Sequence, residues 1–175
     1  MAKKLVYLSL GSNIGDREAN LRSAIARLHH TPDFEVKRIS AVWETAPMYR
    51  TDQPEFLNCV LEAESTLFPM RLLLRAAKIE QDMGRRRAEK NGPRSIDIDI
   101  VIFGRFAMNT PQLQVPHPRM AERRFVLEPL AELAPDLRHP VTCQTVREML
   151  AALPAQTLRK TDLILPVPGS LPGQV

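Results

Sequence analysis

Apolar and polar residues follow two different periods along this chain. Four short stretches alternate between apolar and polar residues or are almost continuously apolar, which predicts strands at residues 5–10, 34–43, 57–65 and 96–103. Two other stretches repeat apolar residues every three or four positions, as one face of an amphipathic helix does, after Asp16 and after Pro69. Asp16 is a suitable N-cap, and proline fits the first turn of a helix.

The order of these elements is strand, helix, strand, strand, helix, strand. This order predicts an α+β fold, namely a ferredoxin-like β-α-β-β-α-β antiparallel sheet with helices packed on one face, followed by a C-terminal extension. In the extension we expect an extended segment at residues 113–117 and helices within 125–133 and 145–153. We expect a single domain over residues 1–160 and an irregular tail rich in proline and glycine over 161–175.

The last strand of this unit carries two aspartates. If the strand alternates regularly, Asp97, Asp99, Val101 and Phe103 share one face, and Ile96, Ile98, Ile100 and Ile102 share the other. Aspartate is disfavoured in strands, and neighbouring like charges destabilise each other unless a cation lies between them. Mg²⁺ binds one or two carboxylates and completes its shell with water and phosphate oxygens. We interpret Asp97 and Asp99 as Mg²⁺ ligands; the alternative is a pair of solvated surface acids.

A basic segment lies just before the aspartates. It contains Arg85, Arg86, Arg87, Lys90 and Arg94 against the single acid Glu89. The whole chain has a formal net charge of +4, so this segment concentrates positive charge in one place. Guanidinium groups suit phosphates, and carboxylates suit a metal. Their combination favours phosphoryl transfer, although a solvated basic loop remains an alternative at this point.

Composition excludes several classes of protein. The chain of 175 residues is 44% hydrophobic and 25% charged, which is typical of a globular protein. It has no apolar run of about 18 residues, and its N-terminal apolar run is too short for a signal peptide. Cys59 and Cys143 are the only cysteines, with no spacing typical of zinc or of a disulfide framework. We therefore expect a cytoplasmic protein with reduced thiols.

Familiar nucleotide-binding signatures are missing from the sequence. It contains no G-x-x-x-x-G-K-[ST] loop and no protein-kinase motif set. Other residues are candidates for binding. His117 and Arg123 follow a proline-rich turn and could reach phosphates, or they could be ordinary exposed charges. Thr45, Phe56 and Asn58 offer a hydroxyl, a ring and an amide for a flat heteroaromatic ligand, although Phe56 could also be a core residue.

These stretches together resemble the 6-hydroxymethyl-7,8-dihydropterin pyrophosphokinase family. The resemblance is carried by residues 90–101 (KNGPRSIDIDIV), 10–13 (LGSN), 52–58 (DQPEFLN) and 115–117 (VPH), with Arg123 and Phe125 after them. It extends from about residue 5 to about residue 150. A signature of this length, in the same order as its supporting stretches, is highly specific.

The resemblance implies an enzyme of folate biosynthesis that transfers pyrophosphate from ATP, its co-substrate, to the hydroxymethyl group of the pterin and releases AMP. It implies that Asp97 and Asp99 coordinate two Mg²⁺ ions. It also implies catalytic roles for Arg85 and Arg94 in stabilising charge on the transferring phosphates. Which of Arg85, Arg86 and Arg87 has which role stays open.

The resemblance further implies the residues that bind each substrate. ATP would contact Leu73, Arg87, Ile100, His117 and Arg123. The pterin would stack between Phe56 and Phe125, and its other contacts would be Thr45, Met48, Asn58 and Asp97. The connections around residues 44–56 and 84–94 would close over the substrates as lids.

Two alternatives to this function remain. A ferredoxin-like module that binds nucleic acid without catalysis would also suit the topology and the basic loop, but strand aromatics are sparse and the two aspartates would repel phosphates. An inactive, ligand-sensing relative would not need the charged residues that are present. We therefore expect ATP and the pterin as ligands, no nucleic acid, no membrane, and a monomer.

Overall fold

The computed structural model describes residues 2–48, 50–84 and 92–169. The first part of the chain forms β1 (Lys4–Ser12), α1 (Arg17–His29), β2 (Phe34–Ile39), β3 (Trp43–Thr45), β4 (Phe56–Ser65), α2 (Pro69–Asp82) and β5 (Asp97–Phe103). The second part forms β6 (Met108–Asn109), β7 (Gln114–Val115), the short 3-10 helix η1 (Met120–Glu122), α3 (Arg124–Leu133), α4 (Val146–Ala152) and β8 (Leu158–Lys160). Each strand and helix expected from the hydrophobic pattern therefore has a counterpart, with the strand expected at residues 34–43 divided into β2 and β3.

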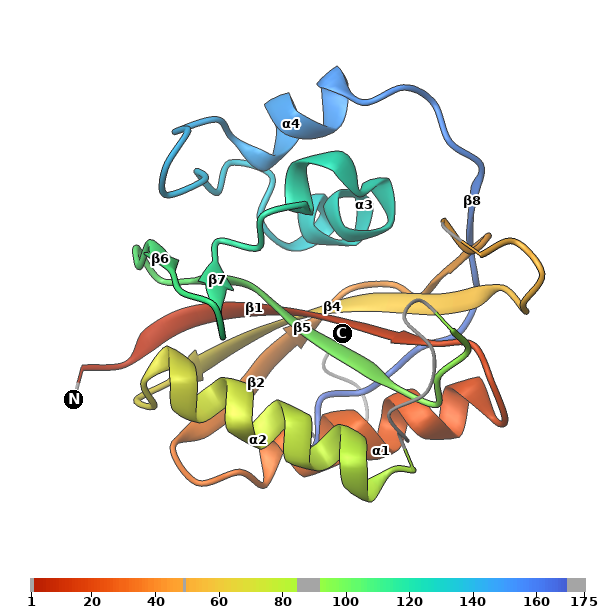
Figure 1. Cartoon of the computed structure of the whole chain (residues 1–175), viewed down its shortest axis with the longest axis horizontal. Coiled ribbons are helices and arrows are strands. Elements are labelled where there is room, and N and C mark those ends of the chain that lie inside the picture. Colours follow the sequence, from red (N-terminus) through yellow and green to blue (C-terminus); the bar gives the residue numbers. More distant parts are fainter. Residues whose placement is uncertain (1, 49, 85–91, 170–175) are drawn as a thin grey trace.

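The main sheet is antiparallel and has the order β5-β1-β4-β3-β8, with β2 also paired to β4 (Figure 1). Its central four strands run in the order β5-β1-β4-β2, and two helices connect them, so the predicted ferredoxin-like fold is confirmed. The short strands β6 and β7 form a separate ribbon. Among the residues described, no helix is both long and apolar enough to span a bilayer.

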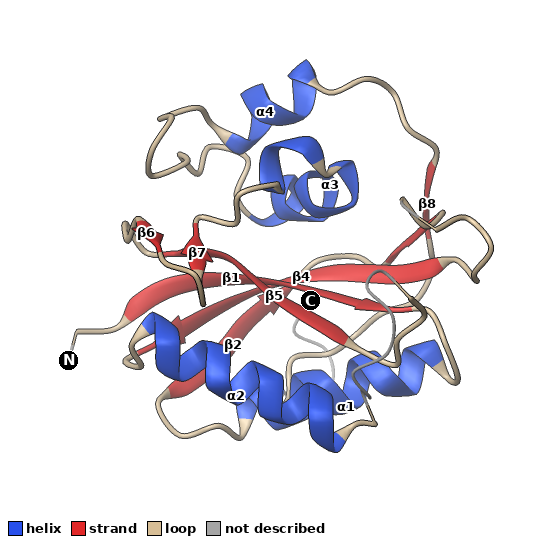
Figure 2. Ribbon diagram, in the orientation of Figure 1, coloured by secondary structure: helices blue, strands red, loops and turns tan. Residues whose placement is uncertain are grey.

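Helices lie on both faces of the sheet, whereas the strand order predicted them on one. Figure 2 shows α1 and α2 on one face, and α3 and α4 on the opposite face. The second pair belongs to the C-terminal extension. The end of α3 is held to β3 and to the residues before it by Glu132, which accepts hydrogen bonds from the backbone N–H of Ala41 (2.9 Å) and from Trp43 Nε1 (3.1 Å). The extension therefore covers part of a face that the ferredoxin-like core leaves open.

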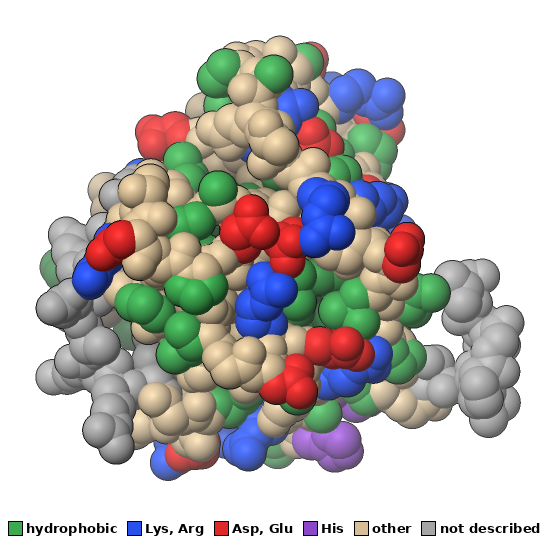
Figure 3. Space-filling view, turned by 90° about the vertical axis from the view of Figure 1, so that its right-hand side faces the viewer, with side chains coloured by type: hydrophobic (Ala, Val, Ile, Leu, Met, Phe, Trp, Pro, Cys, Tyr) green, Lys and Arg blue, Asp and Glu red, His purple; other side chains and the backbone are tan. Residues whose placement is uncertain are grey.

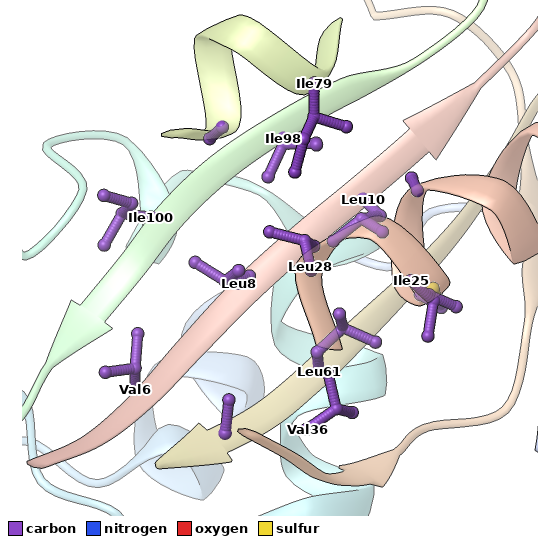
Figure 4. Close-up of a cluster of buried hydrophobic side chains, with 14 of the residues drawn as sticks. Val6, Leu8, Leu10, Ile25, Leu28, Val36, Leu61, Ile79, Ile98 and Ile100 are labelled. Carbon is purple, nitrogen blue, oxygen red and sulfur yellow. The ribbon is translucent and has the colours of Figure 1, made fainter. Parts of the chain in front are cut away.

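The main core lies between the sheet and the pair α1 and α2. Figure 4 shows Val6, Leu8 and Leu10 of β1 among side chains from α1, α2, β2, β4 and β5. Helix α1 begins where the sequence predicts, because Asp16 Oδ1 accepts a hydrogen bond from the N–H of Ala19 at 2.9 Å. This face of the sheet is closed by apolar packing, which leaves the other face for function.

The second predicted strand is interrupted. Residues 34–43 were expected to be one strand, but the ladder stops at Ile39 and resumes at Trp43. Between the two parts, Ser40 exchanges backbone and side-chain hydrogen bonds with Val60: its N–H donates to the carbonyl of Val60, and its hydroxyl accepts from the N–H of Val60, both at 2.9 Å. A side chain that competes for ladder hydrogen bonds interrupts the strand locally.

The alternation predicted for β5 is correct only for its first half. The register against β1 shifts between Tyr7 and Leu8, so that these residues pair with Ile102 and Ile100. Beyond the shift the faces exchange: Ile102 packs under α3 and α4, and Phe103 packs with α1 and α2. A bulge adds one residue and reverses the direction of every side chain after it. Asp97 and Asp99 lie before the shift and keep their predicted common face.

The described part of the tail, residues 161–169, contains no helix or strand and packs against the domain. Strand β8 pairs with β3, and Leu165 is buried in the main core. Arg22 of α1 donates a hydrogen bond to the carbonyl of Ile164 at 3.0 Å. Residues 161–169 therefore contribute to the core beneath the sheet.

The architecture also bears on the nucleic-acid alternative. Helix α3 covers much of the sheet face that such a module would need to expose. On the side of the molecule that carries β8, acidic and basic side chains lie next to one another (Figure 3). Glu44, for example, forms ion pairs with both Arg17 and Arg159. A mixed surface of this kind does not form a continuous positive track for a phosphate backbone.

Candidate active site

A pocket lies where β1, β4 and β5 extend beyond the cover of α3. It has an empty volume of about 880 Å³, part of it open to solvent. Its wall contains Ser9, Gly11, Thr45, Ala46, Met48, Gln53, Phe56, Asn58, Arg94, Asp97, Asp99, His117, Arg123 and Phe125. These residues come from the strands β1, β3, β4 and β5, from the loops after β3 and before β5, and from the turn that leads into α3 together with the first turn of α3. The pocket thus combines rigid strands with several loops.

The sheet register sets the floor of the pocket. Gly11 of β1 lies between Asp97 of β5 and Asn58 of β4 in one row across the sheet. Ser9 lies next to Asp99 in the following row. A Cβ atom built on Gly11 would come within 2.9 Å of Asn58 Oδ1, so this row has no space for a larger residue. The missing side chain leaves the polar groups of Asp97 and Asn58 accessible on either side.

One end of the pocket is charged. Arg94 Nη1 pairs with Asp97 Oδ2 at 2.9 Å, and Arg123 Nη1 pairs with Asp99 Oδ2 at 3.3 Å. Arg123 is the residue directly before α3. It is the more enclosed of the two arginines, with 14% of its side chain exposed. Its Nε is buried without a hydrogen-bond partner among the described residues.

His117 joins this charged end. Its backbone N–H donates to the carbonyl of Val101 at 2.8 Å, and its Nδ1 accepts from the N–H of Arg119 at 3.1 Å. Burial, together with the positive charge of Arg123, lowers the pKa of His117 to about 4. The imidazole is therefore neutral near pH 7. On the other side of the ring, Nε2 lies 3.4 Å from Arg123 Nη1 and 3.9 Å from Asp99 Oδ2.

The other end of the pocket is polar and aromatic. Asn58 is buried, and its Nδ2 donates to Thr45 Oγ1 at 2.8 Å. This bond orients the amide and leaves Asn58 Oδ1 directed toward Gly11. Phe56 and Phe125 contribute rings to the wall, and the Arg123 guanidinium lies 5.6 Å from the centre of the Phe125 ring. Aromatic faces with an oriented amide suit a flat heterocycle that has a polar edge.

The carboxylates fit a metal that is shared with a phosphate ligand. Asp97 and Asp99 come from one stiff strand and open into the same pocket. The described part of the chain contains no group of three or more His, Cys, Asp or Glu side chains that could hold a metal by themselves. Two carboxylates without further protein ligands match Mg²⁺, which commonly completes its shell with water and substrate oxygens.

The structure brings most of the predicted site residues into this pocket. They are Thr45, Met48, Phe56, Asn58, Arg94, Asp97, Asp99, His117, Arg123 and Phe125. Arg85 and Arg87 lie outside the described residues. Leu73 packs against the main core from α2, and Ile100 is buried in that core, so neither lines this pocket. Their contact with the adenine ring stays a prediction.

Sequence reasoning did not select four residues of the wall, namely Ser9, Gly11, Ala46 and Gln53. Gly11 and Gln53 lie within the quoted stretches LGSN and DQPEFLN, but nothing in the sequence shows which residues of β1 face Asp97. That information depends on the antiparallel register of β1 with β5.

Comparisons with known proteins agree with this geometry. The family model described as 7,8-dihydro-6-hydroxymethylpterin-pyrophosphokinase (HPPK) matches residues 7–135, more than half of the chain. The 2-amino-4-hydroxy-6-hydroxymethyldihydropteridine pyrophosphokinase of Bacillus subtilis is 46% identical over 138 residues, covering 79% of this chain and 83% of that protein. The pyrophosphokinase of the same name from Aquifex aeolicus is 40% identical over 162 residues, covering 93% and 98%.

A longer relative and a solved structure extend the comparison. The folic acid synthesis protein fol1 of Schizosaccharomyces pombe is 44% identical over 156 residues, which span 89% of this chain but only 21% of that protein. A crystal structure of a Plasmodium falciparum HPPK-DHPS triple mutant has a TM-score of 0.70 at 16% identity, covering 86% of this chain and 44% of that chain, and so supports the fold. From the family match and the bacterial relatives, this chain belongs to the 7,8-dihydro-6-hydroxymethylpterin-pyrophosphokinase family of folate biosynthesis.

Proposed function

We propose that this chain transfers the pyrophosphoryl group of ATP to the hydroxymethyl oxygen of 6-hydroxymethyl-7,8-dihydropterin and releases AMP. Family membership supports the type of reaction, and one structural observation supports its location. The pocket places an oriented amide and two aromatic rings at one end, and two carboxylates with two arginines at the other. A flat pterin at the first end directs its hydroxymethyl group toward phosphates at the second.

At the pterin end, complementarity of hydrogen bonding supports the proposal. Asn58 Oδ1 is an acceptor toward the pocket, because Thr45 holds the opposite side of the amide. The pterin edge carries an amino group and a ring N–H, which are donors for such an acceptor. Phe56 and Phe125 then enclose the ring faces, with Met48 at the rim. Asp97 lies across Gly11 from Asn58 and can meet the same ligand.

At the phosphate end, we assign Mg²⁺ binding to Asp97 and Asp99. When bound with ATP, Mg²⁺ neutralises phosphate charge and lowers the pKa of a coordinated hydroxyl. Arg94 and Arg123 already lie beside these carboxylates, so each can donate to a phosphate that enters between them. The imidazole of His117, neutral near pH 7, lies at the same end of the pocket, with Nε2 between Arg123 and Asp99.

The edge of the sheet supports an adenine site near Ile100. Strand β5 is the first strand of the sheet, so one side of its backbone faces away from β1. The N–H of Ile98 points in this outward direction and donates to Glu80 Oε1 at 2.7 Å. Ile100, two residues later, has the same orientation and presents backbone groups at this edge. Helix α2, which carries Leu73, packs beside β5. We therefore place the adenine along this edge, in contact with the backbone of Ile100.

The proposal includes two Mg²⁺ ions for each turnover, a monomeric chain and a cytoplasmic location. Cys59 and Cys143 are both free, in accord with a reducing compartment. Light scattering of the purified chain tests the monomer, and the dependence of turnover on free Mg²⁺ at saturating MgATP tests the second ion. A dimer at micromolar concentration, or no dependence on free Mg²⁺, contradicts the corresponding part.

Product analysis tests the function. The purified chain is incubated with Mg²⁺, ATP and 6-hydroxymethyl-7,8-dihydropterin, and the nucleotide products are separated by chromatography. AMP together with a pyrophosphorylated pterin is expected in equal amounts. ADP as the product, or no turnover by the folded chain, contradicts the proposal. A pterin that lacks the hydroxymethyl oxygen is the matched control and is expected to yield no AMP.

A further inference from the structure

Asn13 follows directly after β1 and lies behind the pocket. Only 1% of it is exposed, and it is not part of the pocket wall. Its side-chain Oδ1 accepts from the backbone N–H of Arg94 at 2.8 Å, and its own backbone N–H donates to the carbonyl of Arg94 at 3.2 Å. Its Nδ2 donates to Gln53 Oε1 and to the carbonyl of Pro54, both at 3.1 Å. One buried side chain therefore contacts two segments that are far apart in sequence.

The two segments belong to opposite ends of the pocket. Arg94 is at the charged end and pairs with Asp97. Gln53 lines the wall near Phe56, within the connection between β3 and β4 that carries Met48. The side chain of Gln53 also donates to the carbonyl of Arg50 at 2.8 Å, so the contact with Asn13 reaches further into this connection. Asn13 therefore links this connection directly to the backbone of Arg94.

An asparagine amide is suited to this position. The backbone N–H of Arg94 requires an acceptor, and the carbonyl of Pro54 requires a donor. An amide supplies one of each on a short side chain, and the partners decide which end of the amide faces which segment. Aspartate keeps the acceptor but has no donor for Gln53 and Pro54. Alanine has neither, and it leaves several buried polar groups unsatisfied.

We propose that Asn13 is a positioning residue that couples the pterin end of the pocket to Arg94 at the phosphate end. The inference rests on the proposed function, because it concerns how the two substrates influence each other. Pterin binding orders the connection between β3 and β4, Asn13 transmits this order to Arg94, and Arg94 then meets the phosphates in a fixed orientation. Each substrate consequently binds more tightly in the presence of the other.

The test is ligand binding without turnover. Calorimetric titration measures the affinity of the pterin alone, of a non-hydrolysable ATP analogue with Mg²⁺ alone, and of each ligand when the other is saturating. For the unmodified chain we expect mutual strengthening of about fivefold or more, within the usual range for coupled sites. For Asn13→Ala the strengthening is lost, while the affinity for each single ligand changes less than the coupling does.

Asn20→Ala is the matched control. Asn20 lies nearby in α1, and its Nδ2 donates to Ser12 Oγ (3.2 Å) and to the carbonyl of Ile14 (3.0 Å), but it reaches neither pocket segment. We expect this variant to keep the coupling. Equal loss of coupling in Asn20→Ala and Asn13→Ala, or coupling that persists in Asn13→Ala, overturns the inference.

Two other variants keep the inference testable if Asn13→Ala does not fold. Asn13→Asp retains the acceptor for Arg94 and loses both donors to the other segment, and Gln53→Ala removes one acceptor while Asn13 stays in place. Asn13→Asp is expected to abolish coupling and Gln53→Ala to reduce it; full coupling in both overturns the inference. If the unmodified chain does not bind the pterin at all, the proposed function fails instead, which distinguishes the two failures.

Discussion

The two faces of the central sheet are built from the same strands but end in different chemistry. On the face covered by α1 and α2, the central parts of strands β1, β4 and β5 present apolar side chains. On the opposite face, apolar residues such as Tyr7, Val60 and Val101 lie beneath α3 and α4. Further along the same face, the strands carry polar residues such as Asn58 and Asp97, which line the pocket.

This difference shows how one sheet separates stability from function. Side chains on the closed face are buried from water, so they stabilise the fold mainly through burial of apolar surface. The open part of the other face keeps polar groups on stiff strands, where a ligand can reach them. Tertiary packing therefore holds Asp97 and Asp99 in place without using their own side chains as core.

The largest expected effect is a loss of catalysis when a carboxylate on the open face is replaced, while the packing of the closed face stays unchanged. Asp97→Asn and Asp99→Asn should each lower kcat by about 10²–10³-fold, because a group that organises charge in the transition state is lost. The midpoint of thermal unfolding should change little, since neither side chain is buried. Steady-state kinetics and thermal unfolding of each variant measure the two quantities. Near-normal turnover would remove the metal-binding role.

A substitution in the core of the closed face should instead lower stability. Leu61 is fully buried in the main core, and Leu61→Ala should lower the free energy of unfolding by about 2–5 kcal/mol, through lost burial and the cavity that remains. Leu74 on α2 is the matched control, because 61% of it is exposed, and Leu74→Ala should change stability by no more than about 0.5 kcal/mol. Urea denaturation measures both. Similar effects at the two sites would contradict the difference in burial.

A smaller effect is expected from a substitution at the floor of the pocket. Gly11→Ala places a methyl group 2.9 Å from Asn58 Oδ1 and 3.5 Å from the ring of Phe56. The Asn58 amide must shift from its position on Thr45, so the KM for the pterin should rise by about tenfold, which corresponds to about 1.4 kcal/mol. The KM for ATP should change less, because the charged end is formed by other residues. An unchanged KM for the pterin would contradict this role of Gly11.

The last expected effect concerns pH and develops only below neutral pH. The pKa of His117 is lowered to about 4 in the folded chain, whereas an unfolded histidine titrates near 6.5. Between these values the unfolded chain takes up a proton that folded His117 does not, so this residue reduces stability as the pH falls from about 6.5 to about 4. His117→Gln should remove that contribution. The difference in unfolding free energy between the variant and the unmodified chain should therefore shift in favour of the variant over this range.

Urea denaturation at pH 7.5 and at several values down to pH 4.5 measures this shift. At pH 7.5 the histidine is neutral in both folded and unfolded chains, so the difference measured there is the internal reference. A difference between the two proteins that does not vary with pH would show that His117 titrates normally in the folded chain.

Much of the fold was predictable because it depends on local patterns. Two-residue alternation located β4, and the helical period with Asp16 as N-cap located α1. The order of elements then limited the topology to the ferredoxin-like sheet. The interruption at Ser40 and the exchange of faces after Val101 were not predictable, because each depends on hydrogen bonds to a neighbouring strand.

The sequence by itself determined the chemical groups of this site and their order along the chain. Asp97 and Asp99 share a face because side chains alternate along any strand, and the long signature around them identified the family. Only the tertiary structure decided which groups meet. The antiparallel register places Gly11 between Asp97 and Asn58, and the start of α3 brings Arg123 to Asp99. Contacts between distant segments depend on register and packing, which no local pattern of residues contains.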